Sequence, residues 1–295
     1  MSKVYPSEAA VSEATCPRCF GMYTRRTTPV IEEAMTRTRE LLQNAGIEVV
    51  DMQNILGGTN AEVLLAFGGD GTLLHATRLM APLKVPVLGI NFGHVGYLCA
   101  IKENEIESAL QLIIDGKYTI ESRTMLQGDV YHDGELVWQS RAFNDFQVGG
   151  CNRTVTLEIT INGQAFGRVR GDGVIIASKT GSTAYAFSAG GPVLLIDAIC
   201  LVSSNAVFSS AIRSLVLPTN AHIRIRNLTE IARPYVIADG QKDFLISKNT
   251  ELQVSASNCP ALLVNLGQHS EIETLHRGFQ EVMLRELELP HKADL

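Results

Sequence analysis

Apolar residues follow a helical spacing in the first part of the chain and an alternating spacing in the second. Between residues 20 and 118, short apolar runs alternate with segments in which apolar residues recur every three or four positions. The expected strands are 20–24, 47–50, 63–67 and 85–90, and the expected helices begin at Pro29, near Thr72 and at Glu105. Strands alternating with helices predict an α/β domain with a parallel sheet, whose ligands bind at the carboxyl ends of the strands.

The first helix has clear boundary signals. Thr28 is expected to cap it, Pro29 to be its first residue, and Gly46 to lie just beyond its end. Apolar residues recur at helical steps from Ile31 to Ala45, so one face of this helix is expected to be buried.

After about residue 118 the pattern becomes that of strands. Apolar residues alternate with polar ones through 155–161, as in a strand with one buried face. Asp133-Gly134 and Asn162-Gly163 are hairpin signals, because both central residues of a type I′ turn need positive φ. Further strands are expected at 174–177, 222–226, 251–255 and 262–266. We therefore expect an all-β, sandwich-like domain.

Together these patterns predict four parts. They are an irregular N-terminal arm (1–19), an α/β domain (20–118), a β-rich domain (119–270), and a C-terminal segment (271–295) whose helix, 271–289, returns to pack on the α/β domain. A chain of 295 residues is long enough for about two domains.

Composition excludes several classes of protein. The chain is 45% hydrophobic, so it can form packed cores, and its net charge of −6 with no basic stripe argues against nucleic acid as a partner. No apolar run reaches the roughly 18 residues of a membrane span, and the N-terminus lacks the apolar segment of a signal peptide. These observations predict a cytoplasmic protein without membrane contacts.

The six cysteines are too scattered for a disulfide framework. Only Cys16 and Cys19 have the spacing of metal ligands, and no second such pair follows them. We therefore expect no protein-bound metal centre.

The segment Gly68-Gly69-Asp70-Gly71-Thr72 is the strongest candidate for chemistry. It follows an apolar strand and precedes a helix, and glycines let backbone N–H groups approach an anion such as a phosphate. A carboxylate facing phosphates is repulsive unless a cation or a substrate hydroxyl lies between them. Asp70 is therefore predicted to take part in the reaction.

A second run, from Gly171 to Pro192, is rich in glycine and hydroxyl groups. Such groups suit phosphate and ribose oxygens, and Tyr185 offers an aromatic face. One such loop alone is more often an ordinary connection; two in one chain favour a nucleotide site. Neither run has the spacing of a Walker A loop or of a Rossmann fingerprint, and no nucleophile elbow occurs.

The chain resembles the NAD kinase family over residues 20–270. The shared segments are 67–74 (GGDGT), 91–98, Asn144-Asp145 where the family usually has Asn-Glu, 172–192 (DG…TGSTAYxxSAGGP), and Asp239-Gly240-Gln241. The GGDGT element also occurs in lipid kinases, whereas the long second motif is specific to this family.

The resemblance implies phosphoryl transfer from ATP or polyphosphate to the 2′-hydroxyl of the adenosine ribose of NAD, with Mg²⁺ or another divalent cation on the donor. Asp70 would be the catalytic carboxylate, and Gly68, Gly69, Gly71 and Thr72 would face the phosphates. NAD would be bound by Tyr97, Asn144, Asp145, Arg170, Asp172, Thr180, Thr183, Ala184, Tyr185 and Ser188. Among these, Asn144 and Asp145 would hold the adenine and ribose, Asp172 the nicotinamide end, and Arg170 the new 2′-phosphate. A homodimer or homotetramer is also implied.

Two departures from the family pattern leave alternatives open. Asp145 is one methylene shorter than the usual Glu, and Lys179 replaces the usual Pro, either as a solvated loop charge or as a contact to the donor phosphate.

Two alternative functions stay open for the whole chain. They are a lipid or sugar kinase of the wider GGDGT group and a noncatalytic nucleotide sensor on the same scaffold.

Overall fold

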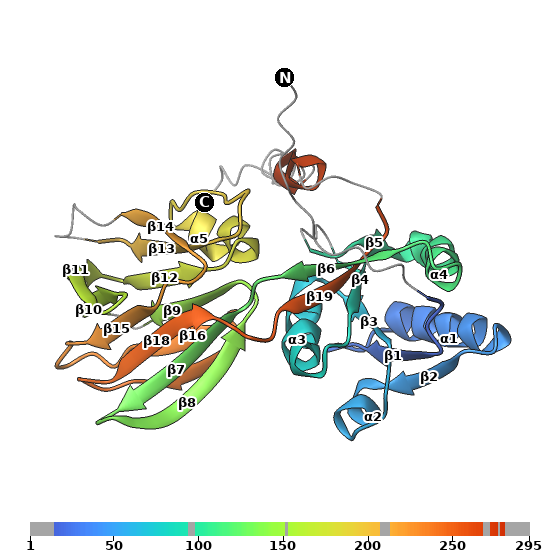
Figure 1. Cartoon of the computed structure of the whole chain (residues 1–295), viewed down its shortest axis with the longest axis horizontal. Coiled ribbons are helices and arrows are strands. Elements are labelled where there is room, and N and C mark those ends of the chain that lie inside the picture. Colours follow the sequence, from blue (N-terminus) through green and yellow to red (C-terminus); the bar gives the residue numbers. More distant parts are fainter. Residues whose placement is uncertain are drawn as a thin grey trace, which may run out of the picture. The chain divides into compact units, whose positions relative to one another are not determined.

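The computed structural model describes residues 15–93, 98–150, 153–206, 213–267, 272–276 and 278–280. The chain forms two compact units, shown in Figure 1. The α/β unit contains the chain up to Ser122 and again from Leu262 onward, and the β unit contains Arg123–Ala261. The α/β unit is thus made from two separate stretches of sequence.

The α/β unit has the predicted alternation of strands and helices. Its elements are β1 (Cys19–Tyr23), α1 (Pro29–Asn44), β2 (Glu48–Asp51), α2 (Met52–Leu56), β3 (Val63–Gly68), α3 (Asp70–Met80), η1 (Ala81–Leu83), β4 (Val87–Asn91), β5 (Ile101–Lys102), η2 (Glu103–Glu105), α4 (Ile106–Ile114), β6 (Thr119–Arg123) and β19 (Ala261–Asn265). The sheet order is β2-β1-β3-β4-β19-β6, with β5 paired to β4. β1–β2, β1–β3, β3–β4, β4–β5 and β4–β19 all pair in parallel. These five pairings confirm the prediction in the form of a mostly parallel sheet.

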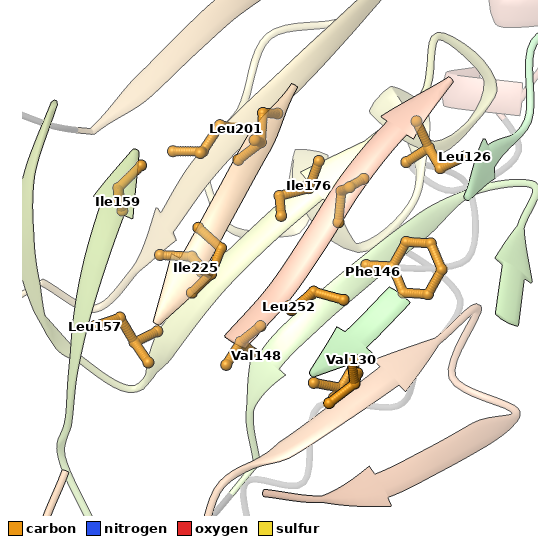
Figure 2. Packing of buried hydrophobic residues seen from close by; sticks show 14 of the residues in the cluster. Leu126, Val130, Phe146, Val148, Leu157, Ile159, Ile176, Leu201, Ile225 and Leu252 are labelled. Atoms are coloured by element: carbon orange, nitrogen blue, oxygen red, sulfur yellow. The ribbon is translucent and has the colours of Figure 1, made fainter. Parts of the chain in front are cut away.

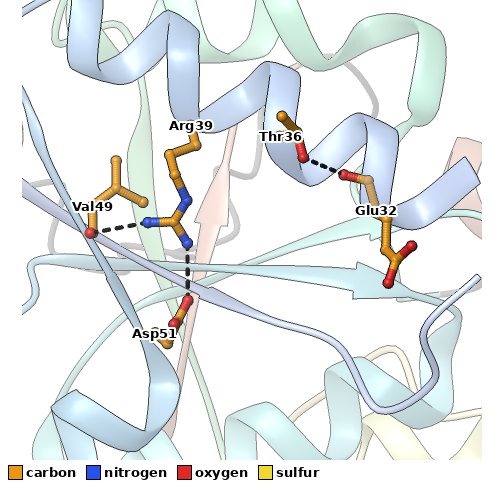
Figure 3. A network of polar contacts seen from close by, with 5 residues as sticks. All are labelled: Glu32, Thr36, Arg39, Val49 and Asp51. Atoms are coloured by element: carbon orange, nitrogen blue, oxygen red, sulfur yellow. Dashed lines mark hydrogen bonds and ion pairs between the residues drawn. The ribbon is translucent and has the colours of Figure 1, made fainter. Parts of the chain in front are cut away.

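Helix α1 begins and ends as its sequence predicts. Thr28 Oγ1 accepts a hydrogen bond from the backbone N–H of Ile31, Pro29 is the first helical residue, and Gly46 follows the helix with φ 76°. On its outer side, Arg39 donates to the Val49 carbonyl (3.2 Å) and to Asp51 Oδ1 (2.9 Å), which ties α1 to β2 (Figure 3).

Helices cover both faces of the sheet. Alternate strand residues such as Phe20, Leu65 and Ile90 join one buried cluster with the apolar faces of α1 and α4. On the opposite face, two glycines let helices approach closely. A Cβ at Gly21 would lie 2.6 Å from Leu64 Cδ1 and would also collide with Ile55 of α2, and a Cβ at Gly89 would lie 2.9 Å from Leu73 of α3. The sheet is therefore the middle of three layers.

One strand lies in a different sheet from the one that the sequence predicted. The segment 262–266 was expected in the β-rich domain, but β19 pairs with β4 and lies between β4 and β6. Its sequence, Ala-Leu-Leu-Val-Asn, is nearly all apolar, as is common for parallel strands buried on both faces.

In the part of the β unit that the structure describes, the strands are accompanied by short helical turns. Its elements are β7 (Leu126–His132), β8 (Glu135–Ala142), β9 (Asp145–Gly149), β10 (Val155–Ile161), β11 (Gln164–Gly171), β12 (Gly173–Ala177), η3 (Thr180–Thr183), α5 (Tyr185–Ser188), β13 (Ala198–Ser204), β14 (Ser214–Pro218), β15 (Ile223–Asn227), β16 (Tyr235–Ala238), β17 (Lys242–Leu245) and β18 (Glu251–Ala256).

These strands make two antiparallel sheets with one shared core. Their orders are β11-β10-β15-β18-β7-β8 and β14-β13-β12-β9-β16-β17. Figure 2 shows buried residues from both sheets in the same cluster, including Leu157 and Ile225 of the first sheet and Ile176 and Leu201 of the second. The expected sandwich is confirmed, since the inner faces of two sheets bury each other.

Both predicted hairpin turns are present. Asp133 and Gly134 have φ of 50° and 85°, and Asn162 and Gly163 have φ of 50° and 79°. They connect β7 with β8 and β10 with β11. Positive φ at consecutive positions is the reason why these turns carry Asp-Gly and Asn-Gly.

The chain termini are described only in part. Residues 272–276 and 278–280 are helical, within the expected C-terminal helix. The rest of that segment and residues 1–14 of the expected arm lie outside the described residues. Among the described helices, none has both the length and the apolar character that a membrane crossing requires.

Candidate functional site

The candidate residues divide between the two units, and in the α/β unit they lie where β3 and β4 end. These strands are neighbours in register, with Gly68 opposite Asn91. The Gly68 carbonyl accepts a hydrogen bond of 3.0 Å from the backbone N–H of Phe92. The glycine loop and the loop after β4 therefore meet at the carboxyl edge of the sheet, where ligands of parallel sheets bind.

The glycine loop turns directly into a helix. α3 begins at Asp70 with Gly69 as its N-cap, two residues before the predicted start near Thr72. A Cβ at Gly68 would lie 2.8 Å from Thr72 Cβ, so no side chain fits there, whereas a Cβ at Gly69 would meet nothing within 4 Å. Space at Gly69, next to the N–H groups of the first helical turn, suits an anion.

Asp70 joins the two loops. Its Oδ1 accepts hydrogen bonds from the backbone N–H groups of Leu98 (3.2 Å) and Cys99 (3.3 Å). The half-buried carboxylate is thereby held in one orientation at the N-terminus of α3. Burial, followed by the adjacent Asp70 charge, raises the pKa of the Cys99 thiol well above its usual range. Cys99 therefore stays a neutral thiol beside Asp70 and adds no second negative charge.

In the β unit, the candidates gather around the start of β9. Asp145, the first residue of β9, lies opposite Ala177, the last residue of β12. The backbone N–H of Ser178 donates to the Asn144 carbonyl (2.8 Å), and a Cβ at Gly181 would lie 2.7 Å from Asn144 Cα. The second glycine-rich run therefore folds against the Asn144-Asp145 pair.

Asp239 holds the same backbone from the other side. Its Oδ2 accepts from the N–H of Phe143 (3.0 Å), and its Oδ1 accepts from those of Asn144 (2.7 Å) and Asp145 (3.2 Å). Sequence reasoning included Asp239 in a motif but gave it no role. The Asp-Gly pair signals a turn, but the hydrogen bonds of Asp239 reach backbone 94 to 96 positions away, so no local sequence signal could have found its role.

Asp145 has an unusual environment. Only 3% of the residue is exposed, and burial raises the pKa of its carboxyl to about 7. The N–H donated by Gln147 (3.1 Å) opposes this rise, and the charge of Asp239 adds to it. Asp145 therefore changes its charge near neutral pH.

Asn144 has an unused acceptor. Its Oδ1 is buried and has no hydrogen-bond partner. A buried carbonyl oxygen without a donor is costly, so a donor on a bound ligand would stabilise it. The unpaired Oδ1, seen in the part of the chain that the structure describes, therefore favours a ligand at Asn144.

The remaining candidates of the second run are presented on short turns. Thr183 Oγ1 donates to the Thr180 carbonyl (3.1 Å) within η3, so this hydroxyl is partly used inside the loop. Tyr185 is 47% exposed, and Ala184 and Ser188 flank it in half-buried and exposed positions. An exposed aromatic ring beside a rigid turn can stack on a flat ligand group.

Asp172 and Arg170 lie at the opposite end of β12 from this group. Asp172 precedes β12 and accepts a hydrogen bond from Asn205 Nδ2 (2.7 Å), and Arg170 is an exposed residue near the end of β11. At about 3.3 Å per residue, the length of β12 separates its ends by roughly 13 Å. Asp172 and Asn144 can therefore contact opposite ends of one long ligand, whereas Arg170 is not brought close to Asn144.

The predictions for Tyr97 and for metal ligands depend on which residues the structure describes. Tyr97 lies outside them. Within them, no group of three or more His, Cys, Asp or Glu side chains has the arrangement of a metal site.

Two family models match this chain. Residues 56–118 match the N-terminal domain of ATP-NAD kinase, and residues 146–266 match its C-terminal domain. The NAD kinase of Natranaerobius thermophilus is 33% identical over 251 residues, which are 83% of this chain and 88% of that protein. The NAD kinase of Azotobacter vinelandii is 35% identical over 239 residues, 79% of this chain and 80% of that protein.

Solved structures share the fold. The crystal structure of yeast NADH kinase complexed with NADH gives a TM-score of 0.81 at 23% identity and covers 99% of this chain and 94% of its own. The crystal structure of an NAD kinase from Archaeoglobus fulgidus in complex with ATP gives a TM-score of 0.69 at 24% identity. The match covers 90% of this chain and 98% of that one. At such identities the likeness concerns the fold alone.

Proposed function

This chain belongs to the NAD kinase family, and from that membership we propose that it transfers a phosphoryl group from ATP to the 2′-hydroxyl of the adenosine ribose of NAD, giving NADP. The observation that carries the proposal is Asp70, a carboxylate held at the start of α3 by the N–H groups of Leu98 and Cys99. Phosphoryl transfer needs an oriented acceptor more than covalent help from the protein.

Asp70 acts on the acceptor hydroxyl. The 2′-oxygen attacks the terminal phosphorus, the new O–P bond forms, and the bond to the bridging oxygen breaks with its electrons leaving on ADP. The proton of the hydroxyl passes to the Asp70 carboxylate and then to water. The two backbone donors on Oδ1 fix the direction of the carboxylate, so Asp70 orients the hydroxyl as well as accepting its proton.

The β unit holds NAD. Asn144 Oδ1, buried and without a partner, accepts from the adenosine part, and Asp145 accepts from ribose hydroxyls. Asp172, at the far end of β12, faces the nicotinamide part, whereas Thr180, Thr183, Ala184, Tyr185 and Ser188 follow the other end of β12, where Asp145 lies opposite Ala177, and contact NAD from there. Asp145 in place of the usual Glu lengthens its contact to the ribose.

The donor phosphates lie on Gly68, Gly69, Gly71 and Thr72. A divalent cation such as Mg²⁺ would neutralise their charge when bound. The chemistry of the loop fits a cation that arrives with the phosphates, because the glycine loop offers a single carboxylate, Asp70, and Mg²⁺ on nucleotides commonly uses one or two carboxylates plus phosphate oxygens and water.

A donor and acceptor matrix tests the proposal. The purified full chain is incubated with ATP or polyphosphate, each with NAD, NADH, diacylglycerol or sphingosine, and the phosphorylated products are separated. NADP formation with ATP is expected. Phosphorylated lipid in place of NADP would support a lipid kinase of the wider GGDGT group. Tight NAD binding without turnover in Mg²⁺ and ATP would indicate a sensor, and either result overturns the proposal.

Oligomeric state belongs to the same proposal. We expect a homodimer or homotetramer, as the family resemblance implies. Light scattering on a sizing column gives the molar mass directly, and a mass near the 32.1 kDa of one chain across micromolar concentrations would contradict this expectation.

A further inference from the structure

We propose that Asp239 is a positioning residue for NAD, because its carboxylate fixes the backbone from which the Asn144 and Asp145 side chains project. The inference rests on the proposed function and assigns a role to a residue outside the proposed substrate contacts. Asp239 lies 94 positions after Asp145 in the sequence, so only the fold brings them together.

The contact is a clamp on three successive peptide groups. The carboxylate of Asp239 accepts the N–H groups of Phe143, Asn144 and Asp145 at 3.0, 2.7 and 3.2 Å. Three donors pointing at one carboxylate require a specific local backbone conformation, and hydrogen bonds to a charged acceptor are stronger than neutral ones. The clamp therefore selects one conformation of the segment that enters β9.

The position of Asp239 is itself fixed. Asp239 and Gly240 both have positive φ, 52° and 63°, in the turn closed by the Gln241 N–H on the Ala238 carbonyl (2.9 Å). The backbone N–H of Asp239 also donates to the Asp145 carbonyl (3.0 Å). Asp145 is thus held through both its N–H and its carbonyl, by the same partner.

Asn144 is held from two sides as well. Asp239 accepts its N–H, and its carbonyl accepts the N–H of Ser178 (2.8 Å). With both peptide groups fixed, the direction of its side chain depends on few remaining torsions. The buried and unpaired Oδ1 is then aimed at one point, which a ligand donor satisfies.

Two variants of Asp239 separate the clamp from the turn. Asp239→Gly removes both acceptor oxygens, and with them all three hydrogen bonds, and is compatible with positive φ, so the turn is kept. Asp239→Asn keeps one oxygen that accepts the N–H groups of Asn144 and Asp145. Its amide nitrogen replaces the oxygen that accepts the Phe143 N–H, so that one hydrogen bond is lost. Asp133 provides the control, because it has φ 50° before Gly134 in a turn of the same kind, and its carboxylate is exposed beside His132.

The measurements are the KM for NAD, the KM for ATP, kcat and the melting temperature. For Asp239→Gly we expect the KM for NAD to rise roughly tenfold, the equivalent of one charge-assisted hydrogen bond, with the KM for ATP within about twofold. Asp239→Asn should raise the KM for NAD by less, and Asp133→Gly and Asp133→Asn should leave it unchanged. If Asp239→Gly does not fold, Asp239→Asn decides the question.

A purely structural role would give a different result. Equal changes in the KM for NAD and for ATP, or a lower melting temperature with an unchanged KM for NAD, would overturn the positioning role. Calorimetric titration of NAD without a donor keeps the two proposals apart. A wild-type chain that binds NAD more tightly than Asp239→Gly but never phosphorylates it would overturn the proposed function and leave the clamp standing.

Discussion

Asp70 Oδ1 accepts a hydrogen bond of 3.2 Å from the backbone N–H of Leu98, a residue 28 positions later in the chain. One carboxylate oxygen thereby fastens the loop after β4 to the first turn of α3. The charge of Asp70 and its role as a backbone acceptor can be separated by substitution, because an amide oxygen still accepts hydrogen bonds.

Asp70→Asn should lower kcat by roughly 10² or more, since it removes the group that orients the hydroxyl and accepts its proton. The KM for NAD should change by less than about threefold, and the melting temperature should stay close to that of the wild type, because Asn retains an acceptor for Leu98 and Cys99. Steady-state kinetics measures both parameters. Asp51→Asn, which removes an exposed carboxylate from the same unit, is the control; near-normal turnover of Asp70→Asn would contradict the assignment.

Gly69→Ala tests the approach of the phosphate. A Cβ at Gly69 meets no protein atom within 4 Å, and its φ of −100° is open to alanine, so stability should be unaffected. A phosphate lying against the loop would meet the new methyl group, and the KM for ATP should rise by roughly tenfold with little change for NAD. Gly57→Ala, at the end of α2, is the matched control. An unchanged KM for ATP would place the donor elsewhere.

The pH dependence of NAD affinity should report the charge of Asp145. The pKa of Asp145 is raised to about 7, mainly by burial and further by Asp239, so the carboxyl becomes ionised as pH rises through 7. An ionised carboxylate accepts ribose hydroxyls more strongly than a protonated one. NAD affinity, measured by titration, should therefore increase between pH 6 and 8, and Asp145→Asn should bind more weakly at pH 8 with little dependence on pH. Asp133→Asn should keep the wild-type profile.

Asp145→Asn should also change stability in a pH-dependent way. The folded pKa of Asp145, about 7, lies above the ordinary value of 3.8, so its contribution to stability is fully present below pH 3.8, decreases as pH rises from there, and is lost once pH has passed 7. The amide that replaces the carboxyl in the variant does not ionise and has no such loss. The variant should gain in free energy of unfolding relative to the wild type as pH increases from 5 to 8, as measured by denaturant titration. A difference that is the same at every pH would show that Asp145 does not titrate there.

Features governed by neighbouring residues were predictable from the sequence. The cap at Thr28, the positive φ at Asp133 and Asn162, and the parallel sheet all follow from local preferences or from periodicity. The start of α3 was placed two residues late because glycine is a poor helix former, although Gly69 serves here as the N-cap. Helix α2, with five residues, is too short to show a helical period.

Features that depend on distant residues were not predictable. Asp70, Asn144 and Asp145 could be chosen from residue type and family motif, but their hydrogen bonds to Leu98, Ser178 and Asp239 exist only after folding. The same holds for β19, because the choice between two sheets depends on a partner strand far away in the chain. Burial, which sets the pKa of Asp145, likewise has no local sequence signal.

The place of β19 between β4 and β6 has a consequence for biosynthesis. A nascent chain on the ribosome cannot complete its first sheet until residue 265 has emerged, after all of Arg123–Ala261 has been translated. The later-made β unit is continuous in sequence and has its own core, so it is free to finish folding while the earlier-made unit still lacks the strand between β4 and β6. Ribosomal pausing or truncation shortly before residue 261 would leave β4 without its partner at Val87, and such an unpaired stretch of strand edge is a site for aggregation.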